Sequence, residues 1–358
     1  MAKFTNEQLA ALARPASVTE EQKLENAENA VKNALSNYSL ASGEYEVFGQ
    51  GSYANNTNIR NNSDIDINVC YTGGFYFRLP SGKTREEYGL TNPTTYSYAQ
   101  FKNDVERILV AHFGRNNVVR KNKCIHIREN TYRVEIDVVP TWKFRRYGTD
   151  RYTYDEGVKL YADNNGEEII NFPKQHLKNG VSKNNTTSRR FKRLVRIVKN
   201  LHVRMEDEGY YNNANITSFL LECLTYNYPN NNFHIEQECD WNNILREYIY
   251  YFWSRTKEDS QEWTQWIEVS ECLYLMYGHK WSREDINTFM YKLWNYLEYN
   301  LDGKSLFQAI HPYTWWDVCR TIYNTGVSSW ALRSTGRKTF VGRFWNMLIH
   351  RFNYRILF

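Results

Sequence analysis

GQGSYANNTNIRNNSDIDINV, residues 49–69, combines a glycine-rich turn with two acidic residues that stand one residue apart. In a β-strand, successive side chains point to opposite faces, so Asp64 and Asp66 would share one face and the isoleucines beside them the other. Two carboxylates this close repel each other, and a cation between them relieves the repulsion. The stretch therefore predicts a strand with a buried aliphatic face and an acidic face that binds cations.

A second stretch, RVEIDVVP at residues 133–140, repeats the alternation and adds Asp137 on its polar face. If the two strands are neighbours about 4.8 Å apart, Asp64, Asp66 and Asp137 converge on one spot. Three carboxylates there suit two divalent cations, with Mg²⁺ expected and Mn²⁺ as the alternative. Two ions about 3.5–4 Å apart stabilise both oxygens of an in-line phosphoryl transfer. For the Asp-Ile-Asp pattern alone, a half-exposed strand without a ligand is an equal alternative.

The turn upstream of the acids favours a metal site over a half-exposed strand without a ligand. Gly49, Gln50, Gly51 and Ser52 follow an expected strand at 45–48 and precede a short helix expected from about Tyr53. Glycines let the backbone approach a phosphate closely, and amides at a helix start attract an anion. The Ser52 hydroxyl would add a donor at the N-cap. The turn is therefore predicted to bind a triphosphate while the acids bind the metals.

The rest of the pattern predicts an α+β chain, in which a mixed sheet comes first and helices follow. Strands are expected at 65–71, 118–127 and 132–139, the last stopped by Pro140, and an Asn-Gly hairpin at 158–172. Helices are expected at 19–38, 97–113, 186–207, 216–228, 241–256, 261–277, 283–300 and 314–324. The change from sheet to helices falls near residue 175.

Composition narrows the class of protein. The 358 residues carry a net charge of +5, which suits a protein that handles phosphates. The six cysteines form no Cys-x-x-Cys pair, so a reducing, cytoplasmic location is expected. The first residues lack the apolar core of a signal peptide. The sequence contains no run of about 18 apolar residues, so no membrane-spanning helix is expected.

Two basic stretches have several interpretations. Residues 189–199 are dense in Arg and Lys; most are expected on a solvated face, with Lys199 and then Lys192 directed at a ligand. From Arg333 to Phe358 there are six basic residues and no acid, in an amphipathic helical pattern. This helix would pack on the body of the protein, bind RNA, or lie on an anionic membrane, the least expected of the three.

The string GSYANNTNIRNNSDIDINV resembles the signature of the DNA polymerase β-like nucleotidyltransferases, and more closely that of the bacterial CD-NTases, relatives of cyclic GMP–AMP synthase. The similarity continues through RVEIDVVPTW, the stretch 171–200 and ITSFLLECLTYN. It implies a nucleotidyltransferase lobe with a small mixed sheet and a helical lobe, separated by a central cleft. The implied domains are the catalytic lobe with its N-terminal helix at 1–175, the helical lobe closing the nucleotide cleft at 176–330, and the basic tail at 331–358.

The resemblance also implies an activity: Mg²⁺-dependent synthesis of a cyclic di- or trinucleotide from ATP, GTP or other nucleoside triphosphates. The product would be a second messenger in anti-phage defence, read by a downstream effector. By the same resemblance, Asp64, Asp66 and Asp137 are the catalytic metal ligands. The nucleotide-binding residues are Gln50, Gly51 and Ser52 on the turn, with Lys199 and Ser218 on helices that contact the donor phosphates.

Two other functions stay open at this stage. In the first, the enzyme makes linear oligonucleotides or adds nucleotides to an RNA end. Alternatively, the protein would be an RNA-binding sensor without turnover, for which its basic surface is suited but its three acids are not. RNA or another ligand would also serve as an activator.

Overall fold

The computed structural model describes residues 2–15, 18–37, 40, 44–59, 65–131, 134–236, 238–278 and 281–299. All of these belong to one compact unit, Met1–Leu306. Asp64, the helix expected at 314–324 and the tail at 331–358 lie outside the described residues. The boundary between domains at residue 175 falls inside this unit and stays a prediction.

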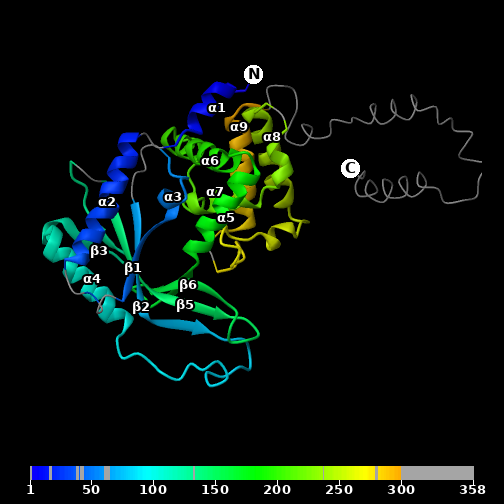
Figure 1. The fold of residues 1–358 in the computed structure, drawn as a ribbon. Coiled ribbons are helices and arrows are strands. Elements are labelled where there is room, and N and C mark those ends of the chain that lie inside the picture. The colour runs from blue at the N-terminus through cyan, green and yellow to red at the C-terminus, as the bar shows by residue number, and fades with distance from the viewer. Residues whose placement is uncertain are drawn as a thin grey trace, which may run out of the picture. The chain divides into compact units, whose positions relative to one another are not determined.

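A mixed sheet organises the first half of the chain (Figure 1). Its order is β1-β2-β5-β4-β3, and β6 and β7 extend it from β5. Strands β2 and β5 are parallel, whereas the other pairs are antiparallel. The strands are β1 (Tyr45–Gln50), β2 (Ile65–Arg78), β3 (Val118–Arg120), β4 (Ile125–Ile127), β5 (Ile136–Tyr147), β6 (Tyr154–Tyr161) and β7 (Glu168–Asn171). The α+β prediction is confirmed.

Helices α2 (Val18–Ser36) and α4 (Tyr98–Phe113) lie side by side against one face of the sheet (Figure 1). Their apolar side chains and those of β2 and β5 form a shared core, in which Ile65, Ile67 and Ile136 are fully buried. The opposite sheet face carries Asp66 and Asp137. The alternation of the two strands thus separates the core from a polar face, as predicted.

The remaining helices are α1 near the N-terminus, the short α3 after β1 and a helical group after β7. They are α1 (Asn6–Leu12), α3 (Gly51–Ala54), α5 (Pro173–Thr186), α6 (Arg190–Asp207), α7 (Ser218–Asn227), α8 (Trp241–Arg255) and α9 (Arg283–Tyr296). Helix α1 was not expected, although the Thr5 side chain and Gln8 form a capping box that begins it. The expected helices at 216–228, 241–256 and 283–300 are confirmed to within a few residues.

Three strand predictions are wrong in detail. The strand expected at 65–71 continues to Arg78, because its pairing with β5 resumes at Phe75 after an irregularity that begins at Tyr71. The segment 118–127 is a hairpin, because the polar residues at 121–123 form a turn closed by the Lys121 amide and the Cys124 carbonyl. Strand β5 continues through Pro140 to Tyr147. Pro140 lies between the segment of β5 that pairs with β4 and the segment that pairs with β6. Proline has no amide hydrogen to donate, but Pro140 pairs with neither β4 nor β6, so no hydrogen bond to those strands is lost there.

Two helix predictions are also wrong. The helix expected at 186–207 begins only at Arg190, because Ser188 and Arg189 have left-handed φ angles of 50° and 62°. The segment 261–277 has a single 3₁₀ turn and then an irregular chain. The backbone of Ile267 there hydrogen-bonds both ways with the side-chain amide of Asn227, at 3.0 and 2.7 Å. Such tertiary bonds replace the bonds that a helix would make.

Candidate active site

A cleft of about 460 Å³ joins the polar end of the sheet to the helical group. Its lining includes six of the predicted site residues, which come from segments far apart in the sequence. They are Gln50, Gly51, Ser52, Asp66, Lys199 and Ser218. Asp137 does not line the cleft but stands beside Asp66 on the next strand. The structure therefore brings the described members of the predicted set to one place.

One row of side chains crosses four strands of the sheet. Asp66 is in register with Gln50 on one side and with Asp137 on the other, and Asp137 is in register with His126. Because β2 and β5 are parallel neighbours, the two aspartates point to the same face of the sheet. The proximity that the sequence predicted for these two acids is confirmed; Asp64, the third, lies outside the described residues.

The turn before this row depends on a glycine. Gly51 has φ +68°, a conformation that glycine adopts without strain. A Cβ atom at this position would overlap Asp66 Oδ2. The backbone of the turn thus lies directly against the carboxylate. Gln50 is the N-cap of α3 and Ser52 its second residue, so the expected N-cap position of Ser52 is wrong by two residues.

Asp137 has two basic partners. Its Oδ1 atom lies 2.8 Å from His126 Nδ1 and 3.2 Å from Lys121 Nζ. Partial burial alone would raise the pKa of Asp137, but the hydrogen bonds from His126 and Lys121 outweigh burial and hold the pKa below its usual value. The carboxylate is therefore ionised at neutral pH.

Carboxylate oxygens are the ligands that Mg²⁺ prefers, so Asp66 and Asp137 fit that ion by their chemistry. Within the described part of the chain, no group of three or more His, Cys, Asp or Glu side chains forms a metal-binding cluster. The third carboxylate of the predicted triad, Asp64, lies outside the described residues. Metal binding thus stays a prediction.

Lys199 occupies a buried ionic cluster at the wall of the cleft. Its side-chain nitrogen donates to Glu222 Oε2 at 2.9 Å and to the carbonyl and hydroxyl oxygens of Thr57 at 3.2 and 3.3 Å. Glu222 also accepts from the Thr57 hydroxyl at 2.6 Å and bonds His176 Nε2 at 3.0 Å. Burial alone would raise the pKa of Glu222, but the Lys199 charge and these hydrogen bonds hold it well below its usual range.

The basic stretch 189–199 is less solvated than expected. Arg190, Arg196 and Lys199 are all more than nine-tenths buried. Arg190 donates to the carbonyls of Phe233 and His234, and Arg196 Nε donates to Ala13 O at 2.7 Å. The prediction of a solvated cationic face is therefore wrong for Arg190 and Arg196, whereas Lys199 was expected to face a ligand and lines the cleft. Their charges hold distant backbone segments together.

A buried polar relay supports Gln50 from behind. The Asn68 side-chain amide donates to Gln50 Oε1 at 3.0 Å, and the Thr141 hydroxyl donates to Asn68 Oδ1 at 2.7 Å. Asn68 and Thr141 have no exposed surface. Asn68 alternates with Ile67 and Val69, a pattern that predicts a place on the polar face beside Asp66. Thr141 stands between Pro140 and Trp142, beyond the expected end of its strand, so its place there was not predicted. Their mutual contact could not be predicted from spacing.

Sequence reasoning did not identify an aromatic pair at the cleft. Phe219 and Trp281 line it with their ring centroids 6.0 Å apart. The two residues are 62 positions apart in the chain, so no periodicity links them. They provide an apolar wall of the kind on which nucleobases stack.

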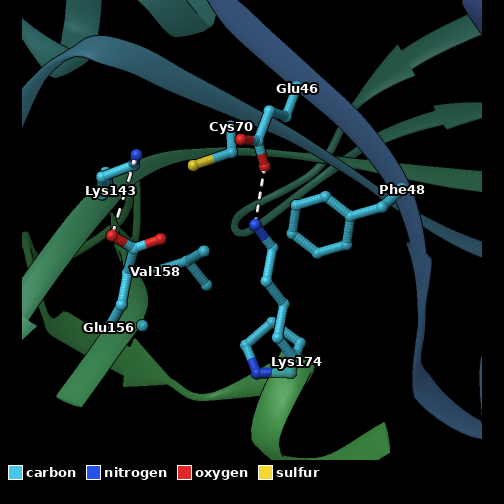
Figure 2. A pocket seen from close by; sticks show the side chains of 9 residues that line it. Glu46, Phe48, Cys70, Lys143, Glu156, Val158 and Lys174 are labelled. Carbon is cyan, nitrogen blue, oxygen red and sulfur yellow. Dashed lines mark hydrogen bonds and ion pairs between the residues drawn. The ribbon is translucent and has the colours of Figure 1, made fainter.

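A second, much smaller cavity of about 10 Å³ lies farther along the same sheet face. Figure 2 shows Lys174 paired with Glu46 across it, beside Cys70 and a second pair formed by Lys143 and Glu156. The Lys174–Glu46 distance is 2.8 Å. This cavity has room for about one water molecule, so of these two cavities among the described residues the larger cleft is the one that can accommodate a nucleotide.

Two aspartates in register beside a glycine turn, on a mixed sheet followed by helices, are the arrangement expected of a nucleotidyltransferase. Comparison with known proteins agrees. The sequence model of the cGAS/DncV-like nucleotidyltransferase C-terminal helical domain matches residues 178–298. The cyclic dipyrimidine nucleotide synthase CdnE of Cecembia lonarensis is 52% identical over 302 residues, which cover 84% of this chain and all of that protein.

Solved structures extend the comparison to the fold. The CdnE cyclic dinucleotide synthase of Elizabethkingia meningoseptica, solved with GTP and Apcpp, has a TM-score of 0.68 and 35% identity, covering 82% of this chain and 99% of its own. The CdnE c-UMP-AMP synthase of Rhodothermus marinus, solved with Apcpp and Upnpp, has a TM-score of 0.71 and 26% identity, covering 84% and 97%. The chain belongs to the CD-NTases, the cGAS/DncV-like nucleotidyltransferases, and its fold is the bilobal polymerase β-like one. It is an enzyme of the cyclic oligonucleotide synthase class.

Among the residues that the structure describes, we find no helix with the length and apolar character of a membrane span.

Proposed function

We propose that this enzyme joins two nucleoside triphosphates into a cyclic dinucleotide in a Mg²⁺-dependent reaction. The observation that carries the proposal is the register of Asp66 with Asp137 beside the Gly51 turn, at one end of a nucleotide-sized cleft. Relatives with the same fold are named cyclic dinucleotide synthases, which favours a ring of two nucleotides over three.

The proposed site divides the work between two groups of side chains. Gln50, Gly51 and Ser52, with Lys199 and Ser218 across the cleft, would bind the triphosphate. Asp64, Asp66 and Asp137 would hold Mg²⁺, which when bound neutralises the phosphates and activates the attacking hydroxyl. In each transfer, a ribose hydroxyl oxygen bonds to the α-phosphorus of the other nucleotide, and pyrophosphate leaves.

The chain's own contribution is positioning and charge. The Gly51 backbone lies against Asp66, so a triphosphate on the turn would be held next to the carboxylates. His126 and Lys121 keep Asp137 ionised and oriented. Phe219 and Trp281 would stack a base and exclude water from that side of the cleft.

We further propose that pyrimidine nucleotides are the preferred substrates. The relative that is 52% identical over its whole length is named a cyclic dipyrimidine nucleotide synthase, whereas one that is 37% identical is named a cyclic dipurine nucleotide synthase. Higher identity over the full enzyme favours the first specificity. The bacterial relatives and the family resemblance support a second messenger in anti-phage signalling, made in the cytoplasm and read by an effector.

Product analysis tests this proposal. The purified protein is incubated with each labelled nucleoside triphosphate and with all four, in Mg²⁺, Mn²⁺ or EDTA. A phosphatase-resistant product with the mass of a cyclic dipyrimidine, absent in EDTA, is expected. A product whose terminal triphosphate is removed by phosphatase would indicate linear synthesis instead. Label transferred only to added RNA would indicate RNA-end addition, and no consumption with or without RNA would favour a binding protein.

A further inference from the structure

Glu222 is an acid in the otherwise largely apolar helix α7, SFLLECLTYN. It is 4% exposed and lines the cleft. Removing a carboxylate from water is costly unless it is paired and hydrogen-bonded. A glutamine would fill nearly the same space without that cost, so the negative charge at this position calls for an explanation.

Four segments of the chain meet at this carboxylate. Lys199 comes from α6, His176 from α5, Glu222 from α7 and Thr57 from the loop after α3. Thr57 also donates its backbone amide to Ser52 O at 2.8 Å. The carboxylate is thereby connected through one residue to the turn that is proposed to bind the triphosphate.

The pairing limits what Lys199 can offer to a ligand. An ammonium group has three donors. All three have acceptors in the cluster: one oxygen of Glu222 and two of Thr57. The Lys199–Glu222 pair is neutral as a unit. A phosphate in the cleft would therefore meet a lysine whose charge is offset by Glu222 and whose donors are shared with the cluster, so Lys199 would bind it only weakly.

We propose that Glu222 is a positioning residue that holds Lys199 against Thr57 and cancels its charge, so that pyrophosphate binds weakly enough to leave after each transfer. This inference rests on the proposed function, in which triphosphates lie along this wall. The same pairing would also lower the affinity for the incoming triphosphate. A nucleoside triphosphate, however, makes further contacts through its base and ribose, and pyrophosphate lacks these contacts.

The substitution Glu222→Gln keeps the size of the side chain and removes its charge. A buried cation without a counterion favours an anionic ligand, so pyrophosphate should bind more tightly. The expected gain is about tenfold, the effect of one charge a few ångströms away in a partly solvated site. A purely structural role for Glu222 predicts the opposite, since distortion of the cleft would weaken binding.

The test is calorimetric titration with inorganic pyrophosphate in excess Mg²⁺. Wild type is compared with Glu222→Gln and with Glu247→Gln, which makes the same chemical change at an acid that pairs with His234 and does not line the cleft. Tighter binding in Glu222→Gln, with stronger inhibition of turnover by pyrophosphate and no change in Glu247→Gln, is expected. Unchanged or weaker binding in Glu222→Gln would overturn the inference.

A second pair of variants protects the test against instability of Glu222→Gln. Lys199→Met leaves the carboxylate alone on the wall of the cleft, whereas Lys199→Met with Glu222→Met removes both charges. The double variant should bind pyrophosphate about tenfold more tightly than the single variant. Equal affinities would refute the role of Glu222. Wild type should bind pyrophosphate about as well as the double variant, because the pair has no net charge. Absence of a cyclic product from wild type in Mg²⁺ would contradict the proposed function, whereas equal affinities of the two variants in a protein that makes the product would contradict only the inference.

Discussion

Asp66 and Asp137 stand in direct register on two parallel neighbouring strands, although 71 residues separate them in the chain. Each alternates with isoleucine or valine residues that fill the core behind the sheet. Moving either strand by one residue would bury its acid in the core and expose an aliphatic side chain. The hydrophobic core therefore fixes the position of the two carboxylates.

The Gly51 turn predicts a sharp loss of function on a minimal substitution. In Gly51→Ala, the added Cβ would displace Asp66, and the residue would be strained at φ +68°. We expect synthesis to fall at least about 100-fold, as for other misplacements of about 1 Å at an active site. The measurement is the initial rate of product formation.

Gly166 provides a matched control. It has the same φ of +68° in the turn between β6 and β7, but a Cβ atom there would meet nothing within 4 Å. Gly166→Ala should lose about 1 kcal/mol of stability from backbone strain and keep its activity. If both variants lose activity equally, strain and not displacement of Asp66 is responsible.

The polar relay behind Gln50 should affect both stability and nucleotide affinity. Asn68→Leu leaves the buried Thr141 hydroxyl without this partner and releases Gln50. We expect a loss of about 1–3 kcal/mol in the free energy of unfolding, the cost of an unsatisfied buried polar group. KM for the nucleoside triphosphate should rise as well, because Gln50 is no longer held in place.

Thr141→Val is the control for this prediction. It should destabilise the protein but change KM less, because Asn68 can still bond Gln50. A rise of KM in Thr141→Val equal to that in Asn68→Leu would contradict the relay.

The hairpin that carries Lys121 and His126 is anchored by a charge network. Lys102 is fully buried and lies 2.9 Å from Asp163 Oδ1, while Arg120 Nε lies 2.7 Å from Asp163 Oδ2. The Arg120 hydrogen bond, aided by Lys102, holds the pKa of Asp163 below its usual value. Asp163→Asn should cost about 3 kcal/mol at neutral pH, because it leaves a buried ammonium without its carboxylate.

The pH dependence of that cost has a definite sign. A carboxylate whose pKa is depressed in the folded state stabilises the fold above its unfolded pKa of about 3.9. That stability is lost as the pH falls through the lower folded pKa. Thermal unfolding of wild type and Asp163→Asn should therefore differ most above about pH 5, and the difference should shrink progressively as the pH falls below about 4. A difference that stays constant from pH 7 to pH 3 would contradict the assignment.

Local patterns were sufficient to predict the acidic face of the sheet that carries Asp66 and Asp137. The alternation in β2 and β5 and the glycines before α3 depend on residues close in sequence. For Pro140 and for residues 261–277, contacts from elsewhere in the fold decided the outcome. Pro140 is accommodated at a gap between β4 and β6, and Asn227 provides the hydrogen bonds that keep Ile267 out of a helix.

The cluster around Lys199 shows the same limit within the site. Lys199 was identified by resemblance, but its partners Thr57 and Glu222 lie 142 and 23 residues away. A single glutamate in an apolar helix was a signal that something must pair with it, because a buried acid requires a partner. The identity of that partner depends on how α6 packs against α7, which spacing alone does not specify.

The most direct test of the account is to compare binding and chemistry in Asp137→Asn. Asp64 and Asp66 would remain to bind the metal that accompanies the triphosphate, so calorimetry should show nucleoside triphosphate binding within a few-fold of wild type. Synthesis of the cyclic product should nevertheless collapse, because the site that activates the attacking hydroxyl has lost a carboxylate. Asp64→Asn with Asp66→Asn should lose both binding and synthesis. Near wild-type synthesis by Asp137→Asn would contradict the central claim that Asp66 and Asp137 form one catalytic site.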